Sequence, residues 1–98
     1  MQKYFLYIDA DMVLAVKFNP IEGTLTIGGN VKFERQMEMI LAEYFECELG
    51  NCSRIMTQAN KARYVCEIER EKFHEGLTRL EEHGFTLTQT DNLERIMR

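Results

Sequence analysis

Two aspartates, Asp9 and Asp11, follow an apolar run and are the first residues whose types and spacing could do chemistry. Paired carboxylates can bind a divalent cation or share acid–base work. They also suit a chain reversal, because an Asp side chain accepts hydrogen bonds from nearby backbone N–H groups. Strand-like patterns in residues 3–9 and 12–18 flank the pair, so the aspartates fall where two strands must reverse. We therefore expect a β-hairpin tip that binds no divalent metal.

The segment "IDAD", residues 8–11, resembles the end of the LAGLIDADG motif of homing endonucleases. The likeness extends through the segment "MEMILAEYF", a hairpin and the segment "EKFHEGLTRLEEHGF". The family's motif helices touch through small residues, whereas this chain has Phe5 and Leu6 at those positions and Met12 in place of the closing glycine. The resemblance implies a nucleic-acid-acting protein in which Asp11 would be the metal-binding acid.

Three cysteines and two histidines are the other residues that could do chemistry. Cys47, Cys52 and Cys66, with His74 or His83, could supply four zinc ligands, although the C-x4-C spacing is wider than the usual knuckle. An odd number of cysteines without a signal peptide fits reduced thiols in a cytosol. Alternation with apolar neighbours predicts that the Cys66 thiol is buried. We therefore expect three free cysteines, with neither a metal nor another cofactor.

No nucleophile has an evident general base in this sequence. Ser53 and the cysteines lack a histidine partner, because both histidines fall in the second predicted helix. His74 lies near the start of that helix and His83 near its end, where a cation suits the helix dipole. The sequence therefore predicts that the protein is not an enzyme.

The composition describes one small acidic domain spanning residues 1–98. The chain is 45% hydrophobic and 29% charged, as in folded proteins, and no apolar run approaches the roughly 18 residues that span a bilayer. The net charge of −4 argues against a nucleic-acid partner, because phosphate binding needs clustered Lys and Arg. Arg63 and Val65 also stand where an RNA-recognition motif places stacking aromatics. We expect a cytoplasmic protein without a membrane partner.

Hydrophobic periodicity divides the chain into strands and helices and predicts an α+β fold. An N-terminal β-hairpin precedes a βαββαβ core, the split βαβ or ferredoxin-like arrangement, with two helices on one face of an antiparallel sheet. Asn30 is expected to cap the first helix, and Gly50 to stop it. The predicted elements are strands at 3–9, 12–18 and 24–29, a helix over 30–50, a hairpin over 52–69, a helix over 70–84, a strand over 85–90 and a short helix from Asp91.

Alternation predicts an apolar surface on the sheet face opposite the helices. So many apolar residues on an open face exceed what a monomer usually exposes, so either a partner or the terminal segment around Leu93, Ile96 and Met97 covers them. On the first helix, Met39 is out of the apolar pattern and lies beside an arginine, as at many protein interfaces. The predicted interface residues are Phe5, Tyr7, Val13, Met56 and Val65 on the sheet, and Arg35, Met39, Glu43 and Glu46 on the first helix.

These features favour a small non-enzymatic binding protein that acts by protein–protein contact, as a homodimer or as an inhibitor of a larger protein. The acidic first helix, with Glu34, Glu38 and Glu48, could occupy a basic site meant for phosphate. A phage-type inhibitor of a host nucleic-acid enzyme would have this character. The alternatives are the endonuclease-like function implied by "IDAD" and a metal-stabilised domain using the cysteines.

Overall fold

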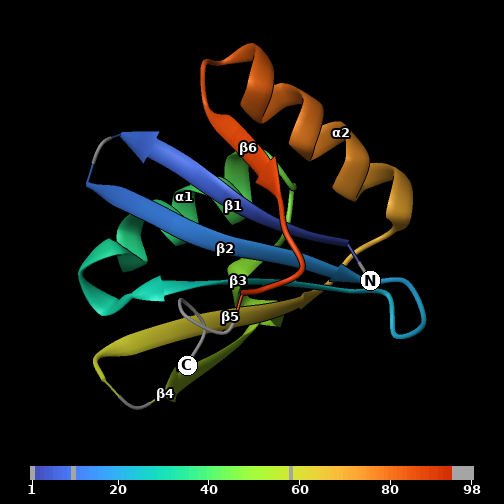
Figure 1. The fold of residues 1–98 in the computed structure, drawn as a ribbon. Coiled ribbons are helices and arrows are strands. Elements are labelled where there is room, and N and C mark those ends of the chain that lie inside the picture. Colours follow the sequence, from blue (N-terminus) through green and yellow to red (C-terminus); the bar gives the residue numbers. More distant parts are fainter. Residues whose placement is uncertain (1, 10, 58, 94–98) are drawn as a thin grey trace.

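The computed structural model describes residues 2–9, 11–57 and 59–93, and it contains a six-stranded antiparallel sheet with two helices on one face (Figure 1). The predicted α+β class and the order of elements are confirmed. In chain order the elements are β1 (Gln2–Asp9), β2 (Met12–Asn19), β3 (Thr24–Asn30), the 3-10 helix η1 (Val31–Phe33), α1 (Glu34–Glu43), the 3-10 helix η2 (Leu49–Asn51), β4 (Ser53–Thr57), β5 (Lys61–Glu67), α2 (Arg70–Glu82) and β6 (Thr86–Gln89).

The sheet has the strand order β4-β5-β3-β2-β1-β6, so its edges are β4 and β6. β5 lies between β3 and β4, the two strands that α1 connects, which is the split βαβ arrangement. The N-terminal hairpin of β1 and β2 is inserted between β3 and β6. This placement depends on which strand edges pair in three dimensions, and the local pattern of the hairpin does not specify it.

The core lies between the sheet and the helices and is formed by alternate residues of the strands, although β3 is buried on both faces. The ring of Phe73 is stacked between two others, with centroids 4.8 Å from Phe18 and 5.7 Å from Phe45. Phe45 joins the end of α1 to α2 through this stack. The other fully buried side chains of the core include Leu6, Leu14, Val16, Leu25, Ile27, Met37, Ile40, Leu41 and Leu80.

The first helix is shorter than its sequence pattern predicts. Asn30 does act as a cap, because its Oδ1 accepts a hydrogen bond of 3.0 Å from the Lys32 N–H, but the cap serves η1, and α1 follows it. The α-helix ends at Glu43, well before Gly50. Tyr44 and Phe45 continue the apolar pattern, yet both pack in the core outside the regular helix. Burial of these two rings therefore produced a helical pattern longer than the helix.

The sheet face opposite the helices, called the open face below, is crossed by the segment that follows β6 (Figure 1). Leu93 is buried there with Ala15, and Phe5 packs against both. Of the two alternatives, cover by the terminal segment or by a partner, the first therefore holds at Leu93. Ile96, Met97 and most of the predicted terminal helix lie outside the described residues. No helix in the described part of the chain is long and apolar enough to cross a membrane.

Candidate protein-binding surface

Asp9 and Asp11 form a hairpin tip, as predicted. Both side chains are exposed, and the Asp11 N–H donates a hydrogen bond of 2.8 Å to Asp9 Oδ1, as expected for an Asp that stabilises a turn. The resemblance to LAGLIDADG proteins implies a helix here, whereas Asp9 ends strand β1. Across residues 2–9, 11–57 and 59–93, no group of three or more His, Cys, Asp or Glu side chains is placed to hold a metal ion.

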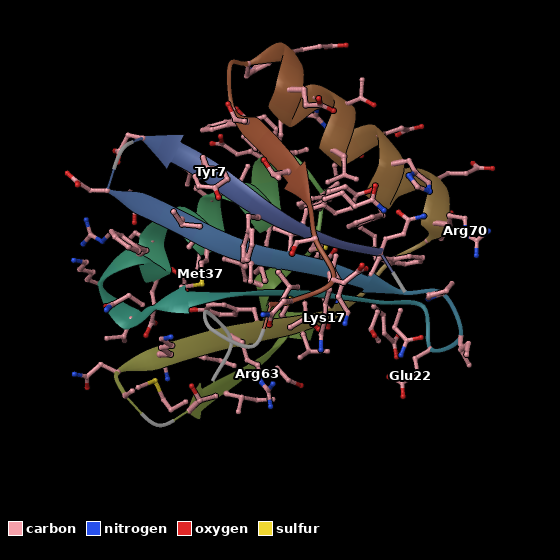
Figure 2. All side chains as sticks on the ribbon, in the orientation of Figure 1. Tyr7, Lys17, Glu22, Met37, Arg63 and Arg70 are labelled. Atoms are coloured by element: carbon pink, nitrogen blue, oxygen red, sulfur yellow. A yellow bond between two sulfur atoms is a disulfide. The ribbon has the colours of Figure 1, made fainter. Side chains whose placement is uncertain are left out.

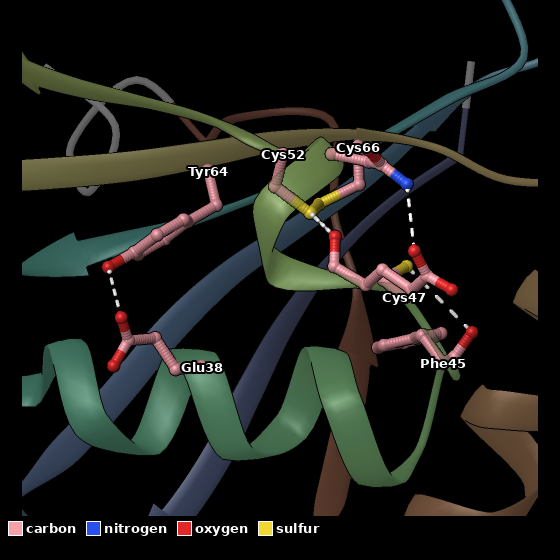
Figure 3. The surroundings of a disulfide bond; sticks show 8 residues. Glu38, Phe45, Cys47, Cys52, Tyr64 and Cys66 are labelled. Carbon is pink, nitrogen blue, oxygen red and sulfur yellow. Dashed lines mark hydrogen bonds between the residues drawn. A yellow bond between two sulfur atoms is a disulfide. The ribbon is translucent and has the colours of Figure 1, made fainter.

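The prediction of three free cysteines is wrong, because Cys52 and Cys66 form a disulfide (Figure 3). The register pairs Ser53 with Val65, which places the two cysteines directly across from each other with Cα atoms 4.5 Å apart. The predicted burial of Cys66 is confirmed. The bond uses two of the three sulfurs invoked for zinc, and it removes the argument for a reducing cytosol that rested on free thiols. The cytoplasmic location stays a prediction.

Cys47 is free and half-buried beside the disulfide. It lines a hollow of about 410 Å³ together with the disulfide and three glutamates, Glu46, Glu48 and Glu67. Burial raises the pKa of the Cys47 thiol, although the nearby Lys72 lowers it in part. A thiol held in its neutral form is a poor nucleophile, so the hollow does not favour covalent chemistry.

The two histidines hold structural contacts on α2. The His83 ring nitrogen Nδ1 and the Tyr44 hydroxyl oxygen are 3.1 Å apart, so the two groups share a hydrogen bond that fastens the end of α2 to the end of α1. His74 is exposed, and its ring contacts Phe73 edge-on. The contact with Tyr44 gives His83 a structural role where α1 and α2 end.

Most of the acidic side chains expected to form a charged surface on α1 bind within the chain. Arg54 Nε donates to Glu34 Oε2 at 2.9 Å, and this guanidinium holds the pKa of the Glu34 carboxyl below its usual range. The Tyr64 hydroxyl donates to Glu38 Oε2 at 3.0 Å (Figure 3). Burial and then the Glu38 carboxylate raise the pKa of Tyr64 to about 12. These contacts join α1 to β4 and β5 and reduce the charge that α1 could offer a partner.

The other predicted helix residues are more scattered than the sequence suggested. Arg35 and Met39 are exposed on α1, but Glu46 lies beyond the helix and its carboxylate pairs with Lys72 at 3.3 Å. At the end of α1, Arg79 Nη2 donates to the Glu43 carbonyl oxygen at 2.6 Å. The four residues therefore do not form one surface on a single helix.

The open face brings together three of the predicted sheet residues and sets a fourth apart. Phe5 and Tyr7 are ring neighbours with centroids 6.4 Å apart, and Tyr7 lies opposite Val13 in the β1–β2 register. Val65 is on β5, separated from β2 by β3, where it pairs with Thr26. The apolar residues of this face thus form two groups, one on each side of β3.

Met56 does not share the face of Val65, so that part of the prediction is wrong. The β4–β5 register places Met56 opposite Ala62, which is buried on the helix side of the sheet. Ile55, opposite Arg63, takes the open-face position instead. The sequence of β4 did not point to Ile55. Four of the five residues of this strand are exposed, so its apolar and polar residues do not alternate. The regular alternation of β5, extended across the turn into β4, would have placed Ile55 on the open face.

Basic side chains gather on the open face although the chain is acidic overall. Figure 2 shows Lys17 and Arg63 projecting from β2 and β5 on the side of the sheet that also carries Tyr7. Among the described strand residues with open-face register positions, four are basic and one, Glu67, is acidic, against a net charge of −4 for the whole chain. The basic four are Lys3, Lys17, Lys61 and Arg63.

Comparisons of the chain with known protein families, with curated proteins and with solved structures found no match. The surface must therefore be interpreted from its own chemistry.

Proposed function

We propose that the protein is a small non-enzymatic binding protein that acts by protein–protein contact through the open face of its sheet. The observation that carries this proposal is the composition of that face. It joins Tyr7, which is exposed and whose ring neighbour Phe5 packs against Leu93, to several basic side chains, in a chain whose net charge is negative. Aromatic side chains are enriched at protein interfaces, which supports a contact surface at Tyr7.

The charge of the open face defines the partner's chemistry. Lys3, Lys17 and Arg63 favour a protein surface with carboxylates around an apolar centre that receives Tyr7 and Val13. A phage-type inhibitor of a nucleic-acid enzyme remains within this proposal. In that role the open face would contact a carboxylate-bearing surface of the enzyme and not its basic phosphate-binding site, because the acidic side chains Glu34 and Glu38 of α1 are bound to Arg54 and Tyr64.

The test is affinity capture from extracts of the native host, followed by calorimetric titration of the purified captured protein. Tyr7→Glu and Val65→Glu change the two apolar groups of the open face. Ile21→Glu is the matched control, because Ile21 is 94% exposed in the loop between β2 and β3, outside the strands of this face. Circular dichroism and urea unfolding confirm that each variant is folded.

We expect one protein that binds the wild type and Ile21→Glu and is lost with both open-face variants. In both open-face variants the new carboxylate would face apolar and acidic groups of the partner, which should lower the affinity severalfold or more. Equal capture by all four proteins would contradict the proposal. Tight binding of a single-stranded oligonucleotide, abolished by Tyr7→Glu, would instead assign the face to nucleic acid.

A further inference from the structure

Within the described part of the chain, strand β4 is an edge strand with little of the protection that edges usually have. Its residues Ser53 to Met56 are all exposed, and the large apolar side chains Ile55 and Met56 are 38% and 51% exposed, on opposite faces. β4 contains neither proline nor lysine, and its one charge, on Arg54, is paired with Glu34. Natural edges are usually blunted by charges, proline or bulges, because an unprotected edge recruits another strand.

The opposite edge shows the contrast. In β6 only Leu87 is apolar, and it packs against the core, while Thr86, Thr88 and Gln89 are polar and exposed. The edge at β6 thus exposes only polar side chains, whereas the edge at β4 exposes two large apolar ones, Ile55 and Met56.

In β4 the backbone N–H and C=O groups of alternate residues point away from β5. A Cα separation of 4.5 Å for Cys52 and Cys66 is that of a non-hydrogen-bonded antiparallel pair. Such pairs alternate with hydrogen-bonded ones, so the pairs of Arg54 with Tyr64 and of Met56 with Ala62 are also non-hydrogen-bonded. The N–H and C=O groups of Arg54 and Met56 therefore point away from β5, toward the open edge.

We propose that β4 pairs antiparallel with β4 of a second copy of this chain, on a two-fold axis through Ile55. In this register Arg54 lies opposite Met56 of the second copy, and Ser53 lies opposite Thr57. The outward N–H and C=O groups of Arg54 and Met56 then form hydrogen bonds across the axis. The two Ile55 side chains are direct neighbours on the open face, and no charge lies opposite a like charge.

Two-fold pairing is favoured because the strand is complementary to itself in this register. The sheets of the two copies join into one, with all four helices on one side and both open faces on the other. The dimer goes beyond the proposed function, since it forms whether or not a partner occupies the open face. It also makes the open faces adjacent, so that one partner could contact both.

Sedimentation velocity over a wide range of protein concentration tests the dimer. Ile55→Lys puts two like charges opposite each other on the axis. Met56→Pro removes an outward N–H and leaves the pairing with β5 in place. Met39→Lys is the control, because Met39 on α1 is 39% exposed, as Ile55 is at 38%. Urea unfolding checks that all variants are folded.

We expect a dimer for the wild type and Met39→Lys, and a dissociation constant raised by about tenfold or more in both β4 variants. A wild type that stays monomeric at every concentration overturns the inference. So does a dimer that both β4 variants leave intact and that Val65→Glu dissociates, because that result would place the interface on the open face.

Cross-linking gives a positive readout that does not depend on loss of folding. In a Cys47→Ser background, Ile55→Cys should form a disulfide between copies on mild oxidation, because the two positions meet in a close non-hydrogen-bonded pair. Met39→Cys in the same background should not. Equal cross-linking at both positions would reflect random collision and would count against the inference.

Discussion

Replacement of Gly76 by alanine should destabilise the fold, although alanine is the better helix former. Gly76 lies inside α2, where a Cβ would come 2.6 Å from Phe45 Cε1 and 2.9 Å from the Tyr44 carbonyl oxygen. Carbon atoms in contact are ordinarily about 3.5–4.0 Å apart, so the Phe45 ring would have to move by about 1 Å. That ring is 1% exposed and stacked on Phe73, which leaves it no space.

The magnitude follows from two opposing terms. Exchange of glycine for alanine in a helix gains about 1 kcal/mol, and overpacking of a close-packed core costs about 1–3 kcal/mol. Because a backbone oxygen as well as a locked ring opposes the new methyl group, the cost should be at the upper end. We therefore expect Gly76→Ala to lower the free energy of unfolding by about 2 kcal/mol, which moves a urea midpoint by about 1 M.

Gly50→Ala is the matched control, because a Cβ at Gly50 has nothing within 4 Å. Its free energy of unfolding should change by less than about 0.5 kcal/mol. Urea unfolding followed by circular dichroism measures both variants against the wild type. A Gly76→Ala protein as stable as the wild type would show that α2 does not pack on Phe45 at this distance.

Three further predictions concern the cysteines and Tyr64. Without reductant, denatured protein should react with a thiol reagent only at Cys47, and after reduction also at Cys52 and Cys66; three reactive thiols before reduction would contradict the disulfide. Replacement of both disulfide cysteines by serine should cost about 3 kcal/mol in urea unfolding, as for a closed loop of this length. The raised pKa of Tyr64, about 12 against the ordinary 10.0, contributes stability that is complete below pH 10 and lost as the pH rises toward about 12. The Tyr64→Phe variant should not lose this part of its stability as the pH rises. An ultraviolet titration that shows Tyr64 ionising near pH 10 would contradict the raised pKa.

The order of elements could be predicted because each has a local signature. The period-two strands, the two amphipathic helices and the aspartate turn between β1 and β2 all appeared where their residues indicated. The end of α1 was not predictable, because Tyr44 and Phe45 extend its apolar period while packing outside the regular helix.

The surfaces could be predicted only where strands alternate cleanly. Tyr7 and Val13 were placed on the correct face, because each stands next to a fully buried leucine of its strand, Leu6 or Leu14, that faces the helices. Met56 lies on an edge strand exposed on both sides, so its face depends on the register with β5, which the sequence of β4 does not contain. The disulfide depends on the same register, since Cys52 meets Cys66 only through that pairing.

Hydrogen exchange of the β4 backbone tests most directly the claim that the sheet continues into a second copy. The amides of Arg54 and Met56 point away from β5, so in a monomer they face solvent, and in the proposed dimer they are hydrogen-bonded. Exchange at these two amides should slow as the protein concentration rises, while exchange in β6 stays constant. Exchange at Arg54 and Met56 that is fast and independent of concentration would contradict the claim.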